Sequence, residues 1–178
     1  MRRLLIIVPV LVLASLFGLF VAMILRGDKG PAISRLVGQN AAAFTLIALD
    51  GTEPVALADY AGQPVVINFF ASWCTPCRAE HPILMDLAAQ GITIIGINYK
   101  DRPEAARAFI EELGNPFVAI GEDANGRTGI DYGITGVPET FVIGADGTIL
   151  TNWASPLDSS IIEKRIMPAL KSAPSPKD

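Results

Sequence analysis

Cys74 and Cys77 are the two cysteines of this 178-residue chain, and two residues separate them. The segment Trp73-Cys74-Thr75-Pro76-Cys77 closely follows the apolar, β-branched run 65–70, which predicts a buried strand. The same segment opens a predicted helix over residues 77–90, so Cys74 lies at a helix N-terminus. Free amide groups and the helix dipole there stabilise a thiolate, the species that attacks a disulfide. One helical turn places Cys77 close enough to resolve the resulting mixed disulfide.

Other uses of such a cysteine pair fit this sequence less well. A structural disulfide across so short a loop restricts the unfolded chain little and would stabilise the fold weakly. Covalent haem attachment needs a histidine directly after the second cysteine, where Arg78 stands. Zinc needs four ligands, and two cysteines with one histidine do not supply them, so we expect no metal and no cofactor. The peroxiredoxin pattern places Thr and Pro before its peroxidatic cysteine, at positions that Ala71 and Ile67 occupy here.

A second candidate segment, Gly136-Val137-Pro138-Glu139-Thr140, precedes a predicted strand over residues 141–143. A proline at such a place is commonly an edge or turn residue. We instead predict a cis Val137–Pro138 bond, mainly from the resemblance described below, since a cis bond needs a structural reason. It would bend the chain beside the cysteines and leave the backbone of Val137 free to pair with an extended substrate.

Glu80 and Glu139 are the ionisable candidates near these two segments. Glu80 lies one helical turn beyond Cys77, where a buried carboxylate with a raised pKa could accept or relay the proton of Cys77. A solvated helix glutamate that pairs with Arg78 or another base fits the same spacing equally well. His81 is the only histidine, and we assign it no role because such residues more often satisfy structure than catalyse.

The elements that must position these residues form one α/β domain, with helices on both faces of a single sheet. Two buried strands, 65–70 and 92–97, are joined by the helix into a βαβ unit, which implies a parallel central pair. Asp146-Gly147 is a hairpin turn signal between the runs 141–143 and 148–153. The other predicted elements are a hairpin over 44–57, a helix capped by Asp101 with Pro103 in its first turn, a short strand over 117–120, and a last helix capped by Ser160 and Glu163.

An apolar run of 22 residues without a charged side chain, Leu4–Leu25, precedes this domain. Its length matches the ~20 residues that a helix needs to cross the hydrocarbon core of a membrane. It lacks the small-residue cleavage site of a secretory signal peptide, and the basic residues Arg2 and Arg3 favour an N-terminus inside the cell. We therefore predict a transmembrane anchor over 1–26, a tether over 27–40, the folded domain over 41–171 outside the cytoplasm, and a flexible tail over 172–178.

The chain beyond the anchor is acidic, with 18 acidic and 11 basic residues after Arg26. Proteins that bind nucleic acids need basic patches that neutralise phosphates. We therefore expect no nucleic-acid partner.

From Val37 to about Leu170 the chain resembles the thioredoxin superfamily, and more closely the DsbE/CcmG family of cytochrome c maturation. The resemblance lies in three stretches, residues 68–82, 96–101 and 132–141, which hold the Trp-Cys-Thr-Pro-Cys, Asn-Tyr-Lys-Asp and Pro-Glu-Thr blocks. The chain departs from the family pattern at Phe70, where Trp is usual, at Asn40 and Ala42, which replace prolines, and at Asn152-Trp153, where an Arg-His pair is frequent.

The resemblance implies a thioredoxin-like fold and a reductant that is tethered to the bacterial inner membrane and faces the periplasm. It implies substrates among the cysteines of apocytochrome c or a thiol protein of its maturation machinery, and re-reduction by a membrane electron carrier. A general extracytoplasmic thioredoxin of the TlpA or ResA kind and a non-enzymatic peptide-binding module are the alternatives. Together with the chemistry above, the resemblance assigns catalysis to Cys74, Cys77 and Glu80, and substrate binding to Trp73, Val137, Pro138 and Glu139.

Overall fold

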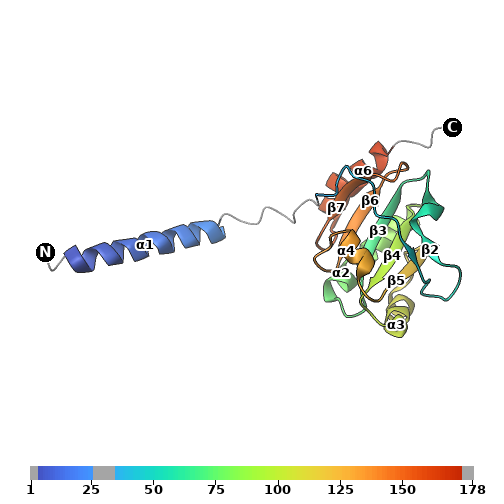
Figure 1. Ribbon diagram of the computed structural model, residues 1–178, viewed down its shortest axis with the longest axis horizontal. Coiled ribbons are helices and arrows are strands. Elements are labelled where there is room, and N and C mark those ends of the chain that lie inside the picture. Colours follow the sequence, from blue (N-terminus) through green and yellow to red (C-terminus); the bar gives the residue numbers. More distant parts are fainter. Residues whose placement is uncertain (1–3, 26–34, 174–178) are drawn as a thin grey trace. The chain divides into compact units, whose positions relative to one another are not determined.

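The computed structural model of the chain describes residues 4–25 and 35–173, which belong to two separate units (Figure 1). The first is helix α1 (Leu4–Leu25), which coincides with the apolar run of the predicted anchor. Within α1, side chains are described for residues 11–22. Among the residues with described side chains, no helix is long and apolar enough to cross a membrane. Residues 27–34 of the predicted tether and 174–178 of the predicted tail lie outside the described residues.

The second unit is built on a five-stranded sheet with the strand order β5-β4-β3-β6-β7. β3, β4 and β5 are parallel, whereas β6 runs antiparallel to both β3 and β7. β3 is buried along its whole length, as its continuous apolar run indicates for a strand with both faces covered. The structure confirms the βαβ unit and the hairpin around Asp146-Gly147. The strands are β3 (Val65–Phe70), β4 (Ile94–Tyr99), β5 (Ala119–Asp123), β6 (Glu139–Ile143) and β7 (Ile149–Trp153).

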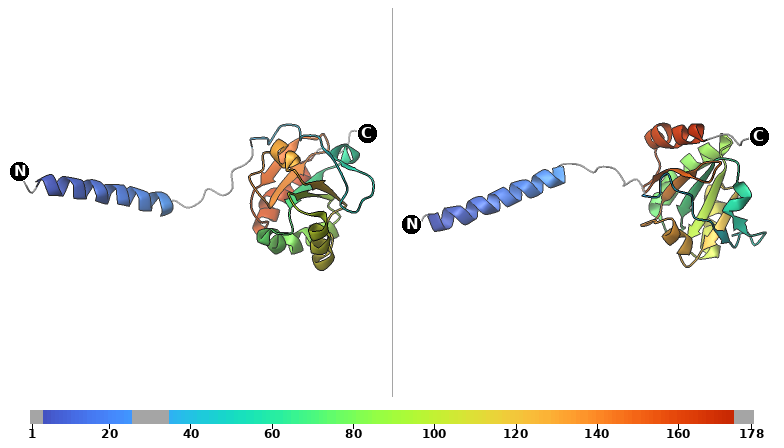
Figure 2. Two further views of the ribbon diagram at one scale, coloured as in Figure 1. Left: turned by 60° about the horizontal axis from the view of Figure 1, so that its bottom comes forward. Right: turned by 45° about the horizontal axis from the view of Figure 1, so that its top comes forward.

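Three helical segments pack on one face of the sheet, which we call the α2 face (Figure 2). Their buried side chains include Leu84, Phe109 and Ile166, which belong to one apolar cluster with Val66 and Phe70 of β3. The segments are α2 (Thr75–Ala89), α3 (Pro103–Leu113), and a C-terminal run of α5 (Ser159–Ile161), the π-helix η2 (Ile162–Ile166) and α6 (Met167–Ser172).

The opposite face is covered by shorter elements. Phe69 of β3 and Tyr132 pack there with ring centroids 5.4 Å apart, in a second apolar cluster that also holds Phe44 and Phe141. The predicted hairpin over 44–57 is confirmed, and the prediction of helices on both faces holds. The covering elements are β1 (Thr45–Leu46), β2 (Val55–Ala56), the 3-10 helix η1 (Leu57–Tyr60) and α4 (Arg127–Asp131), of which α4 was not predicted.

Two predicted helix caps are wrong. The N-cap of α3 is Arg102, and the Asp101 carboxylate reaches instead to Ser72, because a long-range contact overrides the local capping preference. The C-terminal helical run begins at Ser159, because the Asp158 carboxylate accepts a bond from the amide of Ile161 and takes the cap position predicted for Ser160. Asp caps helices as well as Ser does, so composition alone did not separate the two.

Residues 35–40, the described part of the predicted tether, are hydrogen-bonded to the domain. The amide of Gly38 donates to the carbonyl of Ile149 at 2.8 Å, and Asn40 forms a bridge with Thr148. Ser172, the first residue of the predicted tail, is the last residue of α6.

Candidate active site

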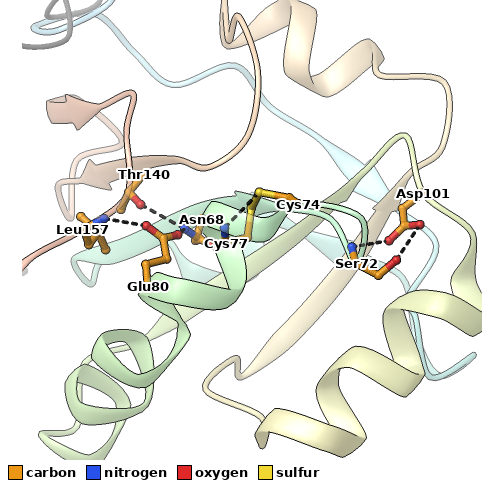
Figure 3. The surroundings of a disulfide bond; sticks show 8 residues. All are labelled: Asn68, Ser72, Cys74, Cys77, Glu80, Asp101, Thr140 and Leu157. Carbon is orange, nitrogen blue, oxygen red and sulfur yellow. Dashed lines mark hydrogen bonds between the residues drawn. A yellow bond between two sulfur atoms is a disulfide. The ribbon is translucent and has the colours of Figure 1, made fainter.

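Cys74 and Cys77 lie at the N-terminus of α2, just beyond the carboxyl end of β3 (Figure 3). They form a disulfide with an S–S distance of 2.04 Å. Cys74 is the N-cap residue of the helix, and its Sγ accepts a hydrogen bond from the amide of Cys77 at 3.0 Å. An amide of the first helical turn therefore points at this sulfur, which favours a thiolate at Cys74 once the disulfide is reduced.

Glu80 lies one turn further along α2 and is only 1% exposed. Its Oε1 accepts a hydrogen bond from Asn68 Nδ2 at 2.9 Å, and its Oε2 accepts one from the amide of Leu157 at 2.7 Å (Figure 3). Asn68 Nδ2 also donates to Thr140 Oγ1 at 3.0 Å. Burial raises the pKa of Glu80 to about 7, although both hydrogen bonds to the carboxylate act to lower it. The carboxyl group can thus gain or lose a proton near neutral pH.

This arrangement excludes one of the two interpretations of Glu80 that the spacing left open, that of a solvated helix glutamate. The side chain is neither solvated nor paired with Arg78, since Arg78 Nη1 contacts Glu112 Oε1 at 2.6 Å on the surface. Helical spacing of three residues puts Glu80 on the same side of α2 as Cys77. Glu80 is therefore a buried carboxyl group on the side of α2 that carries Cys77, and not a surface glutamate.

Glu139 is buried as well, but on the opposite face of the sheet. It is the first residue of β6 and lies across from Phe69, whose side chain belongs to the second cluster. Its Oε1 accepts a hydrogen bond from Asn152 Nδ2 at 2.8 Å. Burial raises the pKa of Glu139, and the hydrogen bond from Asn152 opposes that shift.

The Val137–Pro138 bond is cis, as predicted. Pro138 is buried and directly precedes β6, whose first residues pair with the last residues of β3. Trp73 is 59% exposed, and its indole N–H donates to the carbonyl of Lys100 at 3.2 Å. The cysteine segment starts where β3 ends, and β6 begins beside that same end of β3. The structure therefore brings all seven predicted site residues to the carboxyl end of β3.

The residues that hold the carboxylates were not found from the sequence. Asn68 carried the clearest signal, because it is an amide inside an otherwise apolar strand and must find a partner when buried. Asn152 and Leu157 carried no comparable signal. His81, which received no role, is buried with Nε2 at 3.0 Å from the carbonyl of Gly114, and burial lowers its pKa.

Comparisons with known proteins give a consistent picture. Residues 37–151 match the AhpC/TSA family. The chain is 40% identical over 171 residues to the thiol:disulfide interchange protein HelX of Rhodobacter capsulatus, an alignment that covers 96% of this chain and 97% of the relative. It is 35% identical over 174 residues to the thiol:disulfide interchange protein DsbE of Escherichia coli, with 94% of each chain covered. The thioredoxin domain of a thiol-disulfide oxidoreductase from Bacteroides vulgatus superposes with a TM-score of 0.65 at 25% identity, covering 77% of this chain and 99% of that domain.

Proposed function

The chain belongs to the DsbE/CcmG family of thiol:disulfide interchange proteins, and from this membership we propose that it reduces disulfides of apocytochrome c or of a thiol protein of cytochrome c maturation. Its fold is thioredoxin-like, and its activity is that of a thiol:disulfide oxidoreductase. The observation that carries the proposal is the pair of Cys74 and Cys77 at the start of α2, with a helix amide on Cys74 Sγ.

Reduction of a substrate proceeds in two exchange steps. The Cys74 thiolate attacks one sulfur of the substrate disulfide, which forms a mixed disulfide and releases the other substrate sulfur as a thiolate. Cys77 then loses its proton and attacks Cys74 Sγ, so that the second substrate sulfur leaves as a thiolate. Two electrons pass from the cysteine pair to the substrate. The Cys74–Cys77 disulfide of the structure is the oxidised product of this sequence.

Glu80 is the proposed acceptor of the Cys77 proton. A free thiol has a pKa of ~8.5, so transfer to a carboxylate of pKa about 7 is uphill by only about 2 kcal/mol. From Glu80 the proton can return to a leaving thiolate of the substrate. The direct bonds from Asn68 and Leu157 hold the carboxylate in place during this transfer.

An extended segment of the substrate is proposed to lie between Trp73 and the loop that precedes β6. The exposed indole offers an apolar surface on one side, and the backbone of Val137 offers hydrogen bonds on the other. Pro138 and Glu139, which follow Val137 in the chain, complete the proposed substrate-binding segment. Recognition through the substrate backbone leaves the choice of partner to the side chains that flank its cysteines.

We also propose that α1 tethers the domain to the inner membrane on its periplasmic side, where a membrane electron carrier returns electrons to the cysteine pair. A 22-residue helix is roughly 33 Å long at the rise of an α-helix, enough for the hydrocarbon core. Protease added to intact spheroplasts should digest the domain. Protection until the cells are lysed would contradict this placement, and loss of residues 1–25 from the mature chain would contradict the anchor.

Trapping of the mixed disulfide tests the function directly. Cys77→Ser keeps the attacking sulfur and removes the resolving one, so it should accumulate covalent adducts with natural substrates, whereas Cys74→Ser should accumulate none. We expect apocytochrome c or a thiol protein of its maturation in these adducts. Adducts with many unrelated proteins would support a general thioredoxin instead. The absence of any adduct, with cytochrome assembly unchanged in cells that lack the protein, would leave only a binding module.

A further inference from the structure

The turn that precedes Cys74 is held by the loop that follows β4. The amide of Cys74 donates to the carbonyl of Ala71 at 3.2 Å, so Ser72 and Trp73 are the central residues of a four-residue turn. The Asp101 carboxylate accepts hydrogen bonds from the amide of Ser72 at 2.7 Å and from Ser72 Oγ at 3.1 Å (Figure 3). The bond from the Trp73 indole to the carbonyl of the residue before Asp101 completes the contact. Both central residues of the turn are therefore fixed from outside.

The backbone at this contact has an uncommon conformation. Lys100, which provides that carbonyl, has a φ of 46°, and within the described ranges no other non-glycine residue has a positive φ. Side chains other than glycine adopt such a φ at a cost of roughly 1 kcal/mol or more, and it persists only where the surroundings hold it. Here the amide of Lys100 donates to the carbonyl of Asp123 at 3.0 Å, and Asp101 Oδ1 also accepts from the amide of Arg102 at 2.8 Å. The loop is thus anchored independently of the turn that it holds.

We propose that Asp101 is a positioning residue that fixes Trp73 and Cys74 for attack on a protein substrate; this inference rests on the proposed function. Asp101 acts through Ser72 and the turn, since its carboxylate bonds to a residue two positions before Cys74. A large aromatic side chain that is 59% exposed yet held by its own N–H has little freedom to lose when a partner binds it. A small disulfide needs only the sulfur of Cys74, so its reduction should depend little on this arrangement.

The test compares two substrates in the full-length protein. Asp101→Ala should lower kcat/KM for a disulfide-bonded peptide by about tenfold, mainly through KM, and the rate with a small symmetric disulfide by less than about threefold. Asp146→Ala is the matched control. It also loses a carboxylate bond to a backbone amide, that of Thr148 at 3.0 Å, but it lies in the β6–β7 turn at the far end of the sheet. It should leave both rates unchanged.

A second measurement needs no turnover. In a Trp153→Phe background Trp73 is the only tryptophan, so its fluorescence anisotropy reports the freedom of this indole. Asp101→Ala should lower the anisotropy and Asp146→Ala should not, while Asp101→Asn, which keeps one acceptor oxygen, should fall between them and serves if the alanine variant unfolds. Equal losses with both substrates, or an unchanged anisotropy, would overturn the inference. Failure of the unaltered protein to reduce the peptide would count against the proposed function, and the anisotropy would still decide the role of Asp101.

Discussion

Two buried glutamates, Glu80 and Glu139, lie near the carboxyl end of β3, one on each face of the sheet. Glu80 lies on α2, the helix of the cysteines. It accepts hydrogen bonds from the side-chain amide of Asn68 on β3 and from the backbone amide of Leu157, which precedes α5. Glu139 lies on β6 and accepts hydrogen bonds from Asn152, on the neighbouring strand of the same hairpin, and from the backbone of Thr135. Burial raises the pKa of both. The two carboxyl groups thus differ in the element that carries them and in the groups that bind them, and the proton-acceptor role proposed for Glu80 depends on its place on the helix of the cysteines.

Turnover should separate the two residues most strongly. Glu80→Gln keeps the size of the side chain and removes the proposed proton acceptor, so turnover with a peptide disulfide at pH 7 should fall by about 10²–10⁴-fold, the range for loss of a general base. Glu139→Gln should reduce turnover by less than about tenfold, mainly through KM. Stopped-flow measurement of the release of reduced peptide checks both. Equal losses in turnover would show that Glu80 and Glu139 do not differ in their roles.

Stability should respond to pH in the same order. The pKa of Glu80 is raised in the folded state from 4.5 to about 7, so the native protein binds the proton more tightly than the unfolded chain does. The free energy of unfolding should therefore fall as pH rises from 4.5 to 7, by on the order of 2–3 kcal/mol from this residue. Urea unfolding of Glu80→Gln should lose most of this slope, and Glu139→Gln a smaller part. A slope that survives in Glu80→Gln would assign it elsewhere.

Replacing the side-chain amides that bind the two carboxylates, Asn68 and Asn152, should have different effects on the pH profile of turnover. Below its pKa Glu80 is protonated and cannot accept a proton, so turnover should fall as pH drops below about 7. Asn68→Ala removes a bond that lowers this pKa, so the fall should begin at a higher pH, by about one unit. Asn152→Ala should leave the position of this limb unchanged. A shift in the Asn152 variant would show that the two faces are coupled.

The smallest effect is expected for Arg78, the base that could have paired with Glu80. Arg78→Ala removes an exposed ion pair with Glu112, and such pairs contribute about 0–1 kcal/mol. Thermal unfolding and turnover should both stay close to those of the unaltered protein. A large loss of turnover would restore Arg78 as a partner of the active site.

Local signals were enough to predict much of this molecule. The strand 65–70, the helix that begins at the cysteines and the hairpin around Asp146-Gly147 each depend on periodicity or turn residues within a few positions. The partners of Glu80 could not be predicted in this way, since Asn68 and Leu157 lie 12 and 77 residues from it in the sequence. Asp101 shows the same limit, because a contact with Ser72, 29 residues earlier, took the carboxylate that capping rules give to α3.

The Asn68 amide has one further property, which follows from how its two ends are used. Its nitrogen donates to Glu80 and Thr140, whereas its oxygen is buried with no hydrogen-bond partner among the described residues. An ionised carboxylate only accepts hydrogen bonds, but a protonated one must also donate. A half-rotation of the amide would present that oxygen to the new hydroxyl. The side chain of Asn68 can thus donate to the ionised form of Glu80 and accept from the protonated form, without any movement of the backbone.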